Sequence, residues 1–201
     1  MLIASFVTSL VGIFVFLFIL WKRLKEDLAP EIIFKLGFTI LVGILTGTFL
    51  SLKFFPRYFL WASFLGGFLG LEVSVFRLRL KFYEVFESFI IAALPWVGFV
   101  FLADSVVHSS LSSFLGFLVI LILVFISYYL SAHYKNFGWY KSGKIGFAGM
   151  STLGIVFAIR FILAIFHSTV LSFVGQIEVF ISGVGMLVSF LLLLNLGRLK
   201  E

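Results

Sequence analysis

Residues 156–167 read VFAIRFILAIFH, an apolar run that holds one fixed positive charge, Arg160. An arginine at the centre of a membrane-spanning helix costs about 2.5 to 3.5 kcal/mol, so such residues usually face a cavity or a charged partner. The Arg160 guanidinium could bind a lipid phosphate through paired hydrogen bonds, which is the reading we favour. The alternatives are a structural ion pair with Asp104 or Glu178, or an extension of the side chain to the membrane surface.

Three further polar residues lie near the ends of apolar runs and could take part in chemistry. Asp104 is either the counter-ion of Arg160 or a solvated helix end. His108 and His167 titrate near neutral pH and could act as bases, although a histidine at a membrane boundary is more often interfacial. No metal-ligand cluster, glycine-rich phosphate loop or Ser/His/Asp arrangement is visible in the sequence. We therefore expect neither a metal nor a cofactor.

The composition predicts an integral membrane protein as the scaffold for these residues. Apolar residues make up 62% and charged residues 12% of the 201, whereas soluble domains contain roughly half and a quarter. A spanning helix needs about 20 apolar residues to cross about 30 Å of hydrocarbon. The sequence predicts an all-α bundle of seven such helices in a single domain over residues 1–201. The expected spans are 2–20, 32–54, 59–76, 87–107, 111–130, 147–167 and 175–195.

The basic residues predict the orientation of these spans. Twelve of the fifteen lysines and arginines fall in alternate loops and in the C-terminal tail, and only Lys53 and Arg57 fall on the other side. Cytoplasmic loops are enriched in lysine and arginine, so the N-terminus is expected outside and the C-terminus in the cytoplasm. The basic residues form clusters between the apolar runs, and these loop clusters explain the net charge of +6. We therefore expect no nucleic acid as a partner. Arg160 then lies in the outer half of the membrane.

The segment WASFLGGFLG (61–70) is glycine-rich and includes Gly66 and Gly67. It resembles a motif in the third helix of the bacterial prolipoprotein diacylglyceryl transferases. The pair Arg160 and Phe161 matches an Arg-Phe pair in the family's penultimate helix, and His167 stands where a second arginine is typical. The block order and the seven spans match along nearly the whole chain.

The resemblance implies a function and a set of site residues. The family transfers a diacylglyceryl group from phosphatidylglycerol to the cysteine of a lipoprotein precursor, in the bacterial cytoplasmic membrane. By resemblance, Arg160 and His167 would be catalytic. Gly66, Gly67, Asp104 and Phe161 would bind the lipid or the substrate.

The departures from the family pattern leave a second hypothesis open. Leu65 replaces a histidine, Phe49 an arginine and Ala164 a glutamate, and no lysine or arginine lies between Lys81 and Lys135. These losses favour a non-catalytic relative that binds a lipid or a lipoprotein. A transporter is a weaker alternative, because internal repeats and pairs of broken helices are not apparent.

The glycines allow a packing role beside the functional one. Gly43 and Gly47 are four residues apart, as are Gly66 and Gly70. This small-xxx-small spacing lets two membrane helices approach closely. On spacing alone, packing between the second and third spans is the more usual role.

Overall fold

The computed structural model describes residues 2–138, 140, 145–166 and 173–198, and these residues are helical or in short connections. Within these ranges, seven helices are long and apolar enough to cross a membrane, as the sequence predicts. A helix satisfies its own backbone hydrogen bonds, which lipid cannot do. The helices are α1 (Leu2–Leu24), α2 (Pro30–Phe54), α3 (Phe59–Leu78), α4 (Phe82–His108), α5 (Leu111–His133), α6 (Phe147–Phe166) and α7 (Gln176–Arg198), with short 3-10 turns at Pro56–Tyr58 and Tyr134–Asn136.

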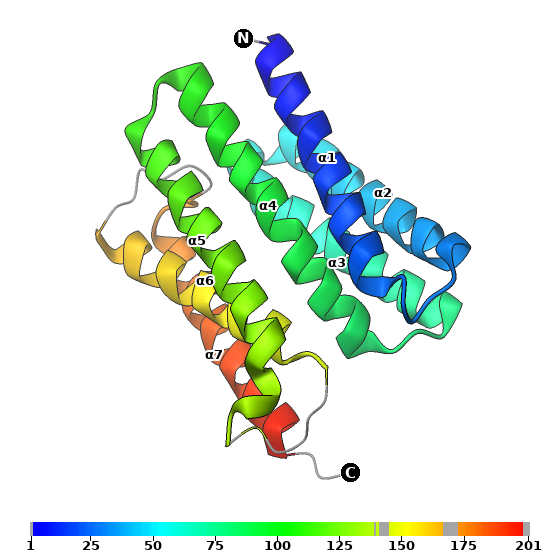
Figure 1. Cartoon of the computed structure of the whole chain (residues 1–201). Coiled ribbons are helices and arrows are strands. Elements are labelled where there is room, and N and C mark those ends of the chain that lie inside the picture. The colour runs from blue at the N-terminus through cyan, green and yellow to red at the C-terminus, as the bar shows by residue number, and fades with distance from the viewer. Residues whose placement is uncertain (1, 139, 141–144, 167–172, 199–201) are drawn as a thin grey trace.

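The helices alternate in direction, so that the start of α1 and the end of α7 lie at opposite ends of the bundle (Figure 1). The end at which α1 and α3 finish carries Lys22, Arg23, Lys25, Arg77, Arg79 and Lys81, and we name it the basic end. The other end, which includes the turn between α4 and α5, is named the opposite end.

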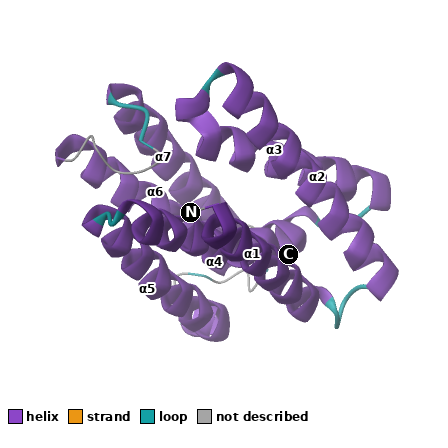
Figure 2. Cartoon of the chain, turned by 90° about the horizontal axis from the view of Figure 1, so that it is seen from above, coloured by secondary structure: helices purple, strands orange, loops and turns teal. Residues whose placement is uncertain are grey.

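Helix α4 is the centre of the bundle. It contacts α1, α3, α5 and α6, and Figure 2 shows it between the α2–α3 pair and the α6–α7 pair. The side chains that pack at the core of the bundle are apolar. Four of them are at most 1% exposed: Phe16, Leu36, Leu71 and Phe89. Packing around α4 therefore forms the interior of the bundle.

The outward faces of the helices are apolar as well. Phe38 is 69% exposed, Phe76 is 82% exposed and Phe180 is 74% exposed. Such extensive apolar surface is unfavourable in water and indicates contact with another apolar phase. Together with the length of the helices, it supports a multi-pass membrane protein.

Glycines join α2 and α3 into a close pair. An added Cβ at Gly43 would overlap the carbonyl oxygen of Gly66, and one at Gly47 would overlap that of Ala62. At Gly70 it would lie 2.6 Å from the carbonyl oxygen of Thr39. The two backbones are therefore in contact, as expected for small residues at this spacing.

Candidate functional site

Glu178 is the centre of a buried polar cluster near the opposite end. It lies in the first turn of α7 and its side chain is 0% exposed. Its Oε1 accepts a hydrogen bond from Arg160 Nε at 2.9 Å and forms an ion pair with Arg160 Nη2 at 2.6 Å. Ser182 Oγ donates to the same oxygen at 2.8 Å, and Trp61 Nε1 donates to Oε2 at 3.0 Å. Both carboxylate oxygens are thus satisfied.

The Arg160 guanidinium lies against two aromatic rings. Its Cζ is 5.3 Å from the centre of the Trp61 ring and 5.0 Å from that of Phe173. Trp61 also stacks on Phe157, with 5.8 Å between the ring centres and 7° between the planes. A cation over an aromatic face is stabilised by the ring quadrupole, more strongly where water is excluded.

The close packing of α6 on α7 positions this ion pair. Gly183 leaves space for the Phe161 ring, and Gly185 leaves space for the Phe157 ring. A Cβ at Gly183 would lie 3.1 Å from Phe161, and one at Gly185 would lie 2.8 Å from Phe157. With the rings seated on glycines, the two helices come close enough for Arg160 to reach Glu178. Phe161 therefore contacts α7.

A cavity of about 770 Å³ lies beside the cluster and is lined by α2 to α6 and by Phe173. Arg160 is the charged residue among its lining residues. The other polar groups are supplied by the indoles of Trp61 and Trp96 and by the hydroxyls of Thr48, Ser63 and Ser112. The remaining lining residues are apolar, including Phe157, so the cavity is suited to a hydrocarbon ligand with few polar atoms.

Asp104 belongs to a different contact, at the turn between α4 and α5. It accepts a hydrogen bond from the hydroxyl of Ser113, and Asp104 Oδ1 is 2.8 Å from Nδ1 of His108. The backbone of Ser109 ends α4 in the left-handed conformation, with φ of 51°. Asp104 thus joins two neighbouring helices. The counter-ion of Arg160 is Glu178 and not Asp104.

The other residues from the sequence are placed as follows. Gly66 lies against Gly43 and Gly47 of α2, and Gly67 lies against Ile44 and Phe89. His167 lies outside the described residues. Of the predicted site residues within the described part, Arg160 is therefore the one that borders the cavity.

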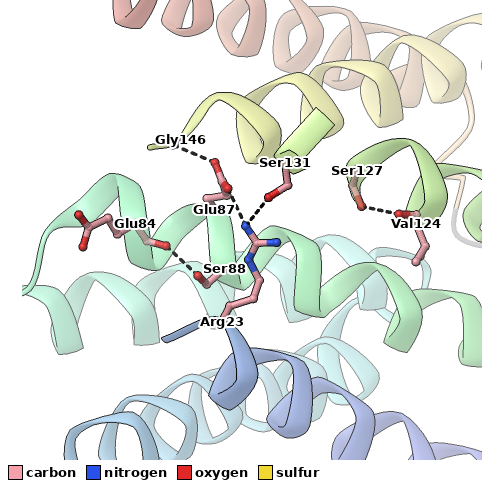
Figure 3. A network of polar contacts seen from close by, with 8 residues as sticks. All are labelled: Arg23, Glu84, Glu87, Ser88, Val124, Ser127, Ser131 and Gly146. Atoms are coloured by element: carbon pink, nitrogen blue, oxygen red, sulfur yellow. Dashed lines mark hydrogen bonds and ion pairs between the residues drawn. The ribbon is translucent and has the colours of Figure 1, made fainter. Parts of the chain in front are cut away.

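A second polar cluster lies at the basic end and is shown in Figure 3. Arg23 Nη2 donates to Glu87 Oε1 at 2.7 Å and to Ser131 Oγ at 2.9 Å. Glu87 Oε2 accepts the backbone N–H of Gly146 at 2.8 Å. The contacts link α1, α4 and α5 to the residue before α6. The sequence does not indicate that Arg23, Glu87 and Ser131 come together, because they are far apart along the chain.

The groups around the second cluster are more exposed. A small cavity of about 170 Å³ beside it is lined by polar residues that include Asp27 and Glu84. Glu84 accepts a hydrogen bond from Lys81 at 3.0 Å, and this contact raises the pKa of Lys81. Within the part of the chain that the structure describes, no group of His, Cys, Asp and Glu side chains could hold a metal ion.

Comparison of the chain with protein-family models, with curated proteins and with solved structures finds no match. The resemblance to the diacylglyceryl transferases stays a prediction from the sequence blocks.

Proposed function

We propose that this membrane protein binds a lipid non-catalytically and holds its acyl chains in the cavity beside Arg160. The observation that carries the proposal is the cavity itself, which measures about 770 Å³ and has a mostly apolar lining. Binding sites for small ligands are typically about 300 to 1,000 Å³. Each methylene that moves from water into an apolar site contributes about 0.8 kcal/mol, so a long chain is the natural occupant.

The charge of the site supports a lipid of modest polarity. Arg160 is paired with Glu178, so the charges of the two side chains balance each other. A phosphate that approached Arg160 would compete with a carboxylate that is already 2.6 Å away. We therefore expect phosphatidylglycerol to bind with only a small advantage over zwitterionic lipids. The hydroxyls of Thr48 and Ser63 would contact ester or headgroup oxygens.

A cavity-filling substitution tests this proposal. Ala93 lines the cavity, and Ala93→Phe would occupy part of its volume. Val106 lies on the same helix but is 65% exposed, so Val106→Phe is the matched control. After purification in mild detergent, lipid extraction and mass spectrometry should show lipid on the wild type and on Val106→Phe, and much less on Ala93→Phe. Equal retention by all three proteins would contradict the proposal.

A second candidate is the diacylglyceryl transferase that the sequence resembles, and the position of Arg160 at the cavity favours it. In that reaction the thiol of a lipoprotein precursor attacks a glycerol carbon of phosphatidylglycerol. A C–S bond forms, the C–O bond to phosphate breaks and glycerol phosphate leaves. A base takes the thiol proton, and Arg160 would stabilise the leaving phosphate.

The surroundings of the substituted positions favour binding over transfer. Leu65 stands where the family has histidine and is 56% exposed, and Phe49 stands where it has arginine and is 68% exposed. Side chains at these positions point out of the bundle, away from the cavity. The non-catalytic function is therefore our first proposal.

Complementation separates the two candidates. The chain would be expressed in bacteria depleted of their own transferase, and conversion of prolipoprotein would be followed by gel shift. We expect no conversion, with the protein present in the cytoplasmic membrane. Conversion by the wild type that is lost in Arg160→Ala would establish the transferase instead, with a lipoprotein precursor as partner.

A further inference from the structure

We propose that α2 and α3 move as one unit away from α6 and α7 to admit a lipid to the cavity, and that Trp61 is the latch that holds this unit closed. The inference rests on the proposed lipid binding, since it concerns access to the same cavity. Three features of the structure support it.

The first feature is the rigidity of the α2–α3 pair. At Gly43, Gly47 and Gly66 no side chain separates the two helices, because a Cβ would overlap a backbone oxygen of the facing helix. The hydroxyls of Thr48 and Ser63 are 2.6 Å apart across the same contact. Sliding or separation of the two helices would break this backbone packing, so they are expected to move together.

The second feature is an uneven attachment of the pair to the bundle. Toward the basic end, Phe68 packs edge-on against Phe82 and Phe86 of α4, with 6.4 and 6.0 Å between ring centres. Phe64 packs on Phe89 at 6.2 Å, nearer the middle. These contacts hold the α2–α3 pair against α4, so the pair can tilt about this line of contact.

Near the opposite end, the α2–α3 pair contacts α6 and α7 through the side chain of Trp61. Trp61 lies at the start of α3 and reaches across to α7 through its hydrogen bond to Glu178. Its ring stacks on Phe157 of α6 and covers Arg160. Figure 2 shows the α2–α3 pair and the α6–α7 pair on separate sides of α4, which is the separation that Trp61 spans.

The third feature is that the latch can open without exposing an unpaired buried charge. When Trp61 leaves, Glu178 Oε1 keeps its hydrogen bonds from Arg160 and Ser182, and Oε2 loses the hydrogen bond from Trp61. Phe173 stays over the guanidinium. Breaking a buried ion pair would be far more costly than losing one hydrogen bond to a pair that remains intact. Opening at Trp61 is therefore less costly than a separation that breaks the Arg160–Glu178 pair.

The chain has no cysteine, so spin labels can be placed without background. Arg57 precedes α3 and Ile177 lies in the first turn of α7, and both are exposed. Arg57→Cys and Ile177→Cys would carry labels for double electron–electron resonance in nanodiscs. Trp61→Ala removes the latch, and Trp61→Phe removes the indole N–H group but keeps a smaller aromatic ring. Trp96→Phe is the control, because Trp96 lines the same cavity and packs on Phe16.

We expect Trp61→Ala to populate a longer label distance that is minor in the wild type. The loss of a hydrogen bond to a charged group should raise that population roughly tenfold or more, and speed exchange of a fluorescent acyl-chain lipid in proportion. Trp61→Phe should give a smaller change, and Trp96→Phe should keep the wild-type distances. Trp61→Phe also provides the test if Trp61→Ala does not fold.

Two outcomes would overturn the latch. One is an unchanged distance distribution and exchange rate in folded Trp61 variants. The other is the same change in Trp96→Phe, which would indicate general loosening. Retention of lipid by the wild type is measured separately. If the wild type retains none, the lipid-binding function fails, whatever the distances show; if it retains lipid and the distances do not change, the latch alone fails.

Discussion

Arg160 and Glu178 form a buried ion pair between α6 and α7, in which one carboxylate oxygen lies 2.6 Å from Nη2 and accepts a hydrogen bond from Nε at 2.9 Å. The charge of Arg160 is therefore balanced within the protein. The pair also joins two helices next to the cavity, because Arg160 lines the cavity while Glu178 is fully buried behind it.

Loss of either partner should be strongly destabilising. Arg160→Met leaves a buried carboxylate, and Glu178→Met leaves a buried guanidinium. We expect each change to lower the free energy of unfolding by about 3 to 5 kcal/mol, as for other buried pairs that lose one member. Denaturant titration in detergent would measure it.

The double variant Arg160→Met with Glu178→Met is the control for that prediction. Replacement of both charges by apolar side chains leaves no unpaired charge, so it should be less destabilising than either single change. Additive losses would show that the two residues do not act as a pair.

Glu87 should contribute more to stability than its neighbour Glu84. Glu87→Ala removes the acceptor of the Gly146 N–H and of Arg23, and a buried polar group without a partner costs about 1 to 3 kcal/mol. Glu84→Ala, one turn earlier on α4, removes a contact with the exposed Lys81 and should have a smaller effect. The melting temperatures of the two variants would be compared. Equal decreases would argue against a structural role for the Glu87 cluster.

The α2–α3 contact should not tolerate even a methyl group at Gly47. Its Cβ would meet the carbonyl oxygen of Ala62, so we expect Gly47→Ala to destabilise by about 1 to 3 kcal/mol. Gly138→Ala places the same methyl group in open space and should be nearly neutral. The unfolding free energies of the two variants provide the measurement. A neutral Gly47→Ala would mean that the helices are farther apart than described.

The predicted orientation can be tested with single cysteines. Ser109→Cys lies in the turn between α4 and α5, and Glu26→Cys lies in the turn between α1 and α2, among basic residues. Because basic loops stay in the cytoplasm, a membrane-impermeant maleimide should label Ser109→Cys in intact spheroplasts. Glu26→Cys should react only after lysis. The reverse labelling pattern would show that the orientation is opposite to the predicted one.

The helices could be predicted from hydropathy to within a few residues, except at the start of α4. The sequence predicts a start at residue 87, which is the second of two glutamates, whereas α4 begins at Phe82. Phe82 and Phe86 pack on Phe68, and Glu87 is neutralised by Arg23, so the charged turn is part of the helix. Hydropathy cannot detect this, because it counts the charge and not its partner.

The candidate site could be predicted only in part. Arg160 is evident as a charge in an apolar run, and the sequence offers both Asp104 and Glu178 as its partner. The choice between them depends on the rotation of the helices, which Gly183 and Gly185 set through packing. Trp61 lies 117 residues before Glu178, and no periodic pattern along the chain connects them.

The central claim is that an acyl chain occupies the cavity, and photo-crosslinking tests it most directly. The protein would be reconstituted with a phospholipid that carries a diazirine near the end of its acyl chain, and adducts would be mapped by mass spectrometry. We predict adducts at cavity-lining residues such as Val97 and Phe157, and their loss in Ala93→Phe. Adducts confined to outward-facing residues such as Phe38 and Phe76, unchanged in Ala93→Phe, would contradict the claim.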